Sequence, residues 1–137
     1  MDWKLELVLV PVTDVDRAKA FYVDKVGFEL DVDHRAGDTF RVVQMTPPGS
    51  ACSISIGTGI TDAPPGSTRG LHLVVTDIEA ARAELAERGV DAGEVFHFEA
   101  GKQAAGPEPE RKDYGSFLSF NDPDGNSWMV QEVGHSR

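Results

Sequence analysis

A seven-residue segment occurs twice in this sequence and constrains the fold more than any other feature. It reads VTDVDRA at residues 12–18 and VTDIEAA at residues 75–81. An apolar run precedes each copy, and a helix-like stretch that ends near a glycine, Gly27 or Gly89, follows it. Self-similarity at a fixed spacing is typical of a duplicated structural unit. The sequence therefore predicts two related modules with a shared pocket between them.

Length and composition limit the domain count and the class of partner. The 137 residues suffice for one domain with a real core, in which module one takes 1–58, a Gly- and Pro-rich linker 59–68, and module two 69–137. A net charge of −10 predicts no nucleic-acid partner. We find no apolar stretch long enough for a bilayer and expect no membrane partner. The lone Cys52 and the lack of a signal-peptide pattern predict a cytoplasmic protein.

The hydrophobic pattern predicts the order βαβββ in each module, and hence an α+β fold. Asp14 and Asp77 are expected to cap helices that end at Gly27 and Gly89. The predicted strands are 4–12, 28–34, 39–45 and 51–57 in module one, and 70–75, 90–98, 115–120 and 127–133 in module two. The helices should cover the outer face of the sheet, because one sheet face is apolar in each module.

Strand parity then assigns the remaining side chains to the opposite face. Leu71, Leu73 and Val75 would face a helix, so His72 between them points away. The same rule gives the residues predicted to bind a ligand: Leu7, Gln44, Ser53, Ser55, His72, Met129 and Gln131. A mixture of apolar side chains with a few polar groups is the usual lining of a small-molecule pocket. A small-molecule ligand is therefore the expected partner.

Three segments together resemble the vicinal oxygen chelate superfamily of glyoxalase I, extradiol dioxygenases, fosfomycin-resistance transferases and bleomycin-resistance proteins. They are 12–22 with Gly27 and Phe28, 70–78 with 88–90, and 120–128. The resemblance covers nearly the whole chain. It implies two βαβββ modules that form a cupped mixed sheet around a cavity, and a homodimer.

The resemblance also bears on metal binding. Metal-dependent members hold a divalent ion with one side chain on each of four cavity strands, and the matching positions here are Leu7, Ser55, Gly70 and Met129. Two of these lack a donor, one is a thioether and one a hydroxyl, which are unsuitable ligands. The sequence thus predicts no metal and no cofactor. The first hypothesis is a metal-independent binding protein that sequesters a ligand, as in the bleomycin-resistance branch.

Two other functions remain open. The chain could be a glyoxalase-like lyase or isomerase, or a dioxygenase-like enzyme, with a rearranged metal site or metal-free acid–base chemistry at His72. Alternatively it could be an interaction module whose cavity is vestigial. His34, His97 and Glu99 could join His72 in a new metal cluster, although a solvated surface is favoured for them. His72 itself could be an anchor for the ligand or a structural histidine.

Several residues near module two carry weaker expectations. The polar segment 99–112 is predicted to be a flap without regular structure that becomes ordered on ligand binding. The aromatic residues that flank it, Phe96, Phe98 and Tyr114, could stack on a planar ligand, but ordinary packing is favoured. Glu132 should be structural or solvated on the helix side. Cys52 should be a small buried hydrophobe, and His135 should lie in a disordered tail.

Overall fold

The computed structural model describes residues 1–134 and divides into two compact units. The first unit comprises residues 1–68 and 122–126, and the second comprises residues 69–121 and those from 127 onward. Each unit contains one helical region and one mixed sheet, so the predicted α+β fold of βαβββ-like modules is confirmed. The cavity expected between the modules stays a prediction, and His135 lies outside the described residues.

The helical region of the first unit begins where the sequence predicts. Asp14 caps α1 (Val15–Ala20), and its carboxylate accepts a hydrogen bond from the backbone N–H of Arg17 at 3.0 Å. The chain then continues as a π-helix, η1 (Phe21–Val26), which the sequence did not indicate. Gly27 ends it at a φ of 92°, a left-handed conformation that glycine adopts without strain.

The sheet of the first unit has the strand order β1-β4-β3-β2. Its strands are β1 (Leu7–Leu9), β2 (Glu29–Ala36), β3 (Phe40–Thr46) and β4 (Ser53–Thr58). Strand β1 runs parallel to β4, and the other pairs are antiparallel. The predicted first strand, 4–12, was too long. Because Leu7 is paired with Ser53, the first residue of β4, no part of β4 lies beside residues 1–5.

The turn at residues 122–126 belongs to the core of the first unit, although both of its chain neighbours lie in the second. The buried Asp122 carboxylate accepts hydrogen bonds from the Tyr22 hydroxyl at 2.8 Å and from the backbone and side-chain amides of Asn126 at 2.9 and 2.8 Å. The Asn126 amide also donates to the carbonyl of Pro11 at 2.8 Å. The sequence predicted only a turn between two strands here.

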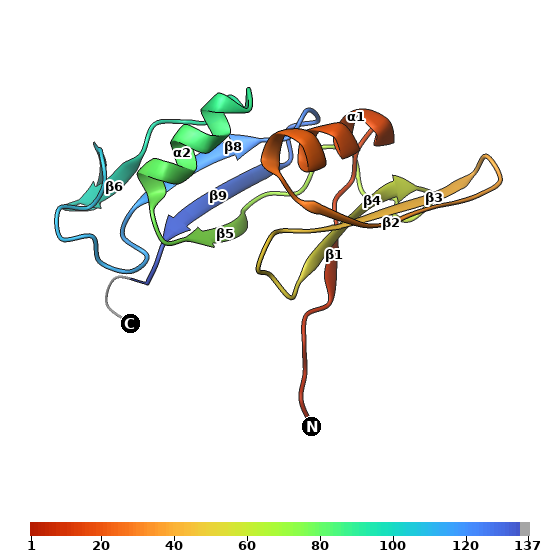
Figure 1. Cartoon of the computed structure of the whole chain (residues 1–137), viewed down its shortest axis with the longest axis horizontal. Coiled ribbons are helices and arrows are strands. Elements are labelled where there is room, and N and C mark those ends of the chain that lie inside the picture. Colours follow the sequence, from red (N-terminus) through yellow and green to blue (C-terminus); the bar gives the residue numbers. More distant parts are fainter. Residues whose placement is uncertain (135–137) are drawn as a thin grey trace. The chain divides into compact units, whose positions relative to one another are not determined.

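The second unit has the strand order β5-β9-β8-β6-β7, with β5 and β9 parallel. Its strands are β5 (Leu71–Val75), β6 (Phe96–Glu99), β7 (Lys102–Ala105), β8 (Phe117–Asn121) and β9 (Ser127–Glu132). The helix α2 (Ile78–Glu87), capped by Asp77 as predicted, lies along one face over β8 and β9 (Figure 1). Leu118, Phe120, Trp128 and Val130 are buried on that face.

The segment 99–112 is not the structureless loop that its composition suggested. Strand β7 pairs antiparallel with β6, and the N–H of Gly106 donates to the carbonyl of Val95 at 2.8 Å. Further along, the Glu108 carboxylate accepts from the backbone N–H groups of Glu110 and Lys112 at 3.1 and 2.8 Å. Hydrogen bonds rather than apolar burial hold this segment, which is why the hydrophobic pattern missed it.

Candidate ligand-binding site

The second unit has a pocket on the sheet face that points away from α2. Ser119 of β8 and Met129 of β9 are paired on this face, whereas their neighbours Leu118 and Val130 are buried on the helix side. The pocket has a volume of about 510 Å³, which lies within the range of roughly 300–1,000 Å³ that is typical of small-molecule sites. Its lining residues are Gly93, Glu94, Val95, Phe96, Gln103, Ala104, Ala105, Ser119 and Met129.

A cluster of three phenylalanines forms part of the same sheet. The rings of Phe96 and Phe117 stack at a centroid distance of 5.5 Å, and Phe98 meets Phe117 edge-on at 5.6 Å. The rings pack on one another, as the favoured interpretation of Phe96 and Phe98 requires. Phe98 nevertheless remains 54% exposed. Phe96 lines the pocket, so this cluster supplies an apolar wall at one side of it.

His72, Met129 and Gln131 share the sheet face on which the pocket opens. His72 of β5 pairs with Met129 of β9, and Val74 pairs with Gln131. The Nδ1 atom of His72 is hydrogen-bonded to the carbonyl oxygen of Gly70. Because a carbonyl oxygen only accepts, Nδ1 carries the proton, and in a neutral ring Nε2 is then an acceptor. The exposed side chain thus presents a fixed tautomer to this face.

The other four predicted residues share one face of the first unit's sheet. Leu7 pairs with Ser53, and Gln44 pairs with Ser55. A simple hairpin at residues 46–50 would have paired Gln44 with Ser53, and the observed register differs from that expectation by two residues. The amide of Gln44 still reaches Ser53 diagonally, with 3.4 Å between Nε2 and Oγ. Each unit therefore groups its own predicted residues, and whether the two groups line one cavity stays a prediction.

A directed chain of hydrogen bonds crosses the first unit's face. The Thr46 hydroxyl donates to the Asp31 carboxylate, which only accepts. The Ser53 hydroxyl, 2.6 Å from Thr46 Oγ1, must then donate to Thr46 and accept from Gln44. Ser55 stands outside this chain: its hydroxyl oxygen is buried and has no hydrogen-bond partner among residues 1–134. A buried hydroxyl without a partner is unusual in a folded protein.

The proposed histidine cluster is not assembled. His97 is only 4% exposed, so the expectation that it is solvated was wrong. Its Nδ1 donates to the carbonyl of Gly106 at 2.7 Å, and its Nε2 lies 2.9 Å from the Glu99 carboxylate. Both contacts raise the pKa of His97, the Glu99 contact more strongly. His34 contacts Phe40 in the first unit, and no three His, Cys, Asp or Glu side chains of the described chain are placed to hold a metal ion.

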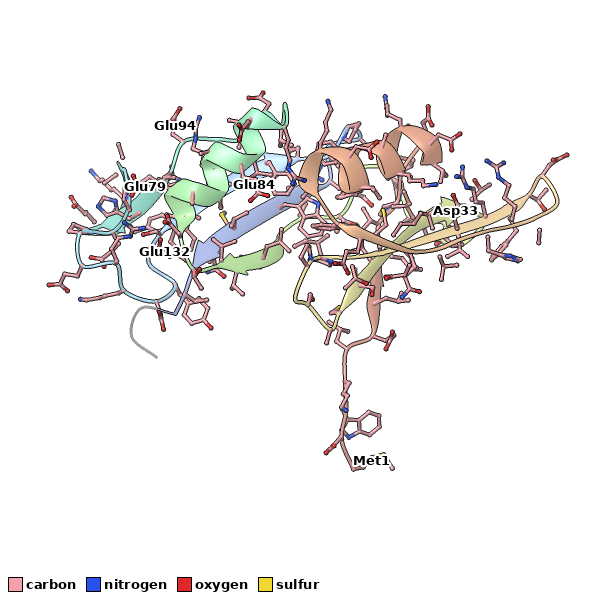
Figure 2. The ribbon with its side chains drawn as sticks, viewed as in Figure 1. Met1, Asp33, Glu79, Glu84, Glu94 and Glu132 are labelled. Carbon is pink, nitrogen blue, oxygen red and sulfur yellow. The ribbon has the colours of Figure 1, made fainter. Side chains whose placement is uncertain are left out.

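Glu132 lies on the helix side as predicted, and it is fully buried, which bears out the structural rather than the solvated alternative. Its carboxylate accepts from Arg111 Nε at 2.7 Å, from Arg111 Nη2, and from the backbone N–H of Ile78 at 2.9 Å. The carboxylate raises the pKa of Arg111. Figure 2 shows Glu132 at the end of β9, near the first turn of α2, where Glu79 lies. On the helix side of β9, Glu132 follows the apolar residues Trp128 and Val130. An acid at such a position was the available sequence signal for a buried carboxylate.

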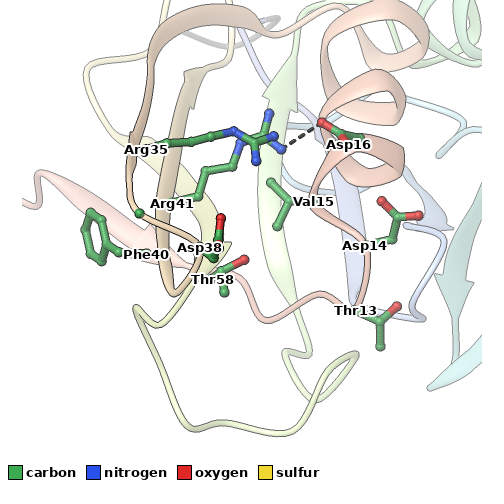
Figure 3. Close-up of a pocket in the computed structure, with 10 residues that line it drawn as sticks. Thr13, Asp14, Val15, Asp16, Arg35, Asp38, Phe40, Arg41 and Thr58 are labelled. Atoms are coloured by element: carbon green, nitrogen blue, oxygen red, sulfur yellow. Dashed lines mark hydrogen bonds and ion pairs between the residues drawn. The ribbon is translucent and has the colours of Figure 1, made fainter.

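A second pocket, of 330 Å³, lies beside the start of α1 and is lined largely by charged side chains (Figure 3). Arg41, which is only 8% exposed, binds Asp16 at 2.7 Å and Asp33 at 2.9 and 3.0 Å. These contacts lower the pKa of both carboxyl groups, and that of Asp33 is lowered further by Lys19. The buried guanidinium of Arg41 is thus paired with two carboxylates. We therefore interpret the charged side chains at this pocket as a structural ion-pair network.

Two βαβββ modules, each with a helix on one sheet face and apolar and polar side chains on the other, define a known class of protein. The model of the Glyoxalase/Bleomycin resistance protein/Dioxygenase superfamily matches residues 4–130. The chain belongs to this superfamily.

Solved structures with the same fold include two from Streptomyces sp. CB03234. The antibiotic binding protein TnmS3 is 34% identical, with 97% of this chain and 98% of TnmS3 covered and a TM-score of 0.74. A glyoxalase/bleomycin resistance protein is 35% identical, with 94% and 100% covered and a TM-score of 0.71. The protein YetH of Bacillus subtilis (strain 168) is 26% identical over 125 residues, which are 91% of this chain and 94% of YetH.

No helix among the described residues is long and apolar enough to cross a membrane.

Proposed function

We propose that this chain binds an amphiphilic small molecule and sequesters it unchanged, without a metal. The observation that carries the proposal is the chemistry of the four positions at which metal-dependent relatives hold their ion. Leu7 and Gly70 offer no side-chain donor, and Met129 offers only a thioether. Gly70 has a φ of 75°, a conformation that a histidine or glutamine ligand would adopt only with strain.

The lining of the second unit's pocket supports a ligand with an apolar body. Phe96, Val95 and Met129 provide apolar surface, and Gln103 and Ser119 provide a few polar groups. The pocket volume of 510 Å³ lies in the range of small-molecule sites. The likeness to TnmS3, an antibiotic binding protein, favours the same class of ligand for this chain.

The polar residues indicate which hydrogen-bonding groups the ligand should carry. On the second unit, Nε2 of His72 would accept a hydrogen bond, and the Gln131 amide could donate or accept. On the first unit, Ser55 has a hydroxyl proton without an acceptor, beside Gln44. We propose that Leu7, Gln44, Ser53, Ser55, His72, Met129 and Gln131 contact the ligand. The ligand would thus carry at least one donor and one acceptor on an apolar framework.

Binding can be tested with the amphiphilic aromatic dye 8-anilinonaphthalene-1-sulfonate. We expect saturable fluorescence enhancement that bleomycin or a related antibiotic displaces. Met129→Glu should abolish it, because a carboxylate among the lining residues is costly to bury against the dye's rings and repels its sulfonate. Glu84→Ala, on the exposed side of α2, is the matched control and should bind as the wild type does. Equal dye binding by both variants would contradict the pocket assignment.

Sequestration without a metal makes a second, separate prediction. Elemental analysis of the purified chain after mild dialysis should find no stoichiometric transition metal. Mass spectrometry of the antibiotic recovered from its complex with the protein should show that its mass is unchanged. A stoichiometric metal that also raises the melting temperature would refute the proposal, because ligands that bind the native state stabilise it by mass action.

Metal-free acid–base chemistry at His72 is the second candidate function. The observation that favours it is the Gly70 carbonyl, which fixes the tautomer and leaves Nε2 as a base on the pocket face. The hemithioacetal of methylglyoxal and glutathione is a suitable probe for glyoxalase-like isomerisation. Turnover by the wild type that His72→Ala abolishes, with the fold retained, would favour the enzyme. No turnover together with antibiotic binding would favour sequestration.

A further inference from the structure

The exposed residue Asp31 lies at one end of a hydrogen-bonded chain that leads to Gln44. The chain runs from the Asp31 carboxylate through the hydroxyl groups of Thr46 and Ser53 to the Gln44 amide. It crosses three neighbouring strands, because Asp31 belongs to β2, Thr46 and Gln44 to β3, and Ser53 to β4. Gln44 is one of the residues proposed to contact the ligand, whereas strand parity did not single out Asp31.

A bulge in β2 brings Asp31 to the start of this chain. The residues Asp31 and Val32 together lie opposite Gln44 alone, so β2 has one additional residue at this point. The additional residue of a bulge is released from regular pairing, and bulges often re-aim a side chain beside a functional site. Here the released carboxylate accepts a hydrogen bond from the Thr46 hydroxyl. The bulge thus adds an acceptor to the polar face of the first unit's sheet.

The carboxylate sets the direction of every hydrogen bond in the chain. Because a carboxylate only accepts, the single hydroxyl proton of Thr46 is donated to Asp31. Thr46 Oγ1 can then only accept from the Ser53 hydroxyl, which lies 2.6 Å away. With its own proton used, Ser53 Oγ must accept from Nε2 of Gln44 at 3.4 Å. The opposite direction would need a donor at position 31, which a carboxylate lacks.

The direction of the chain decides which end of the Gln44 amide is left for a ligand. The amide nitrogen is turned to Ser53, and Oε1 accepts no hydrogen bond from any residue between 1 and 134. Gln44 is only partly buried, so its side chain is not enclosed by the first unit. A freely rotating amide offers either a donor or an acceptor, but an amide held by its nitrogen offers an acceptor alone.

We propose that Asp31 is a positioning residue that acts through Thr46 and Ser53 and holds the Gln44 amide with its oxygen toward the ligand. The face then selects a ligand that donates an O–H or N–H group to Gln44, such as a phenol or an alcohol, over one that only accepts, such as an ether. An amide that is already held loses little freedom on binding, which favours the matching ligand. The selection of ligands rests on the proposed function, whereas the positioning of Gln44 does not.

Nuclear magnetic resonance of the ligand-free chain tests the positioning directly. The side-chain amide of Gln44 should give sharp signals in the wild type. Asp31→Asn keeps the shape of the side chain but can donate as well as accept, so both directions of the chain become available. The Gln44 signals should then double or broaden through exchange. Glu29→Gln, an exposed carboxylate opposite Thr46, is the matched control and should leave them sharp. Broadening in the wild type, or none in Asp31→Asn, would overturn the proposal.

Calorimetric titration with 2-naphthol and 2-methoxynaphthalene tests the selection, because these probes share one ring system but only the first donates. Comparing the ratio of their dissociation constants between variants cancels the difference in their size. Asp31→Asn should lower the preference for 2-naphthol by about fivefold, since the flipped amide donates to the ether. Thr46→Val should act alike, and the double variant should lose no more.

The control and the failure of binding have separate meanings. Glu29→Gln should keep the wild-type ratio. An unchanged ratio in Asp31→Asn, or an equal fall in Glu29→Gln, would overturn the proposal. If neither probe binds while the Gln44 signals respond to Asp31→Asn as expected, the positioning of Gln44 is supported and the proposed function is refuted.

Discussion

The buried pair of Glu132 and Arg111 allows a quantitative test of how the second unit is stabilised. Glu132 is fully buried, and both of its carboxylate oxygens accept hydrogen bonds from the Arg111 guanidinium. One oxygen also accepts from the N–H of Ile78 in the first turn of α2. The pair joins the end of β9, the start of α2 and the segment that follows β7. We therefore expect Glu132→Ala to loosen all three.

The size of the effect follows from what each substitution leaves behind. Removing one partner of a buried ion pair costs about 3–5 kcal/mol. The Arg111 side chain is 31% exposed and keeps Glu79 at 3.2 Å, so Glu132→Ala should cost about 3 kcal/mol, at the lower end of that range. The double substitution Glu132→Leu with Arg111→Met leaves no unpaired charge. It should cost only about 1 kcal/mol, mainly for the lost bond to Ile78.

Urea unfolding followed by tryptophan fluorescence measures these costs. Trp128 lies in the core of the second unit with 2% of its surface exposed, so it reports on that unit. Trp3 is 89% exposed, so its fluorescence should change little on unfolding. Glu79→Ala is the matched control and should stay within about 0.5 kcal/mol of the wild type. The reasoning fails if Glu132→Ala costs less than the control, or if the double variant is as unstable as the single one.

Three further substitutions test other parts of the chain. Ser55→Ala removes a buried hydroxyl without a partner, so it should raise the free energy of unfolding by about 1 kcal/mol. The same substitution should weaken antibiotic binding. A variant that is destabilised in urea unfolding would contradict this prediction. The lowered pKa of Asp33 means that its stabilisation is complete at neutral pH and is lost as the pH falls below the ordinary value of 3.8. Asp33→Asn should therefore lower the melting temperature at neutral pH and flatten its decline in acid. The raised pKa of His97 has the opposite sign, so its contribution is complete below the ordinary value of 6.5 and is lost as the pH rises through the raised pKa. Hydrogen exchange of the β7 amides, corrected for the intrinsic rate, should accelerate over that interval, and His97→Gln should remove the dependence.

The sequence determined the features that depend on near neighbours in the chain. The repeat predicted two modules, and Asp14 and Asp77 cap the two helices as expected. Strand parity placed His72 and Met129 on one face, because alternate side chains of a strand point to opposite sides. These features follow from hydrogen bonds and periodicities that span only a few residues.

The tertiary structure decided which polar groups are buried. Nothing near Glu132 in sequence predicts that Arg111 pairs with it. Strand β7, which pairs with β6 beside the buried His97, has no hydrophobic pattern. Likewise, the turn containing Asp122 joins the first unit through Tyr22, one hundred residues earlier in the chain. The cost of burying a polar group depends on the partners that the fold brings to it. Local periodicity therefore assigns a residue to a face, and only the distant partners decide whether a polar residue on that face is solvated or buried.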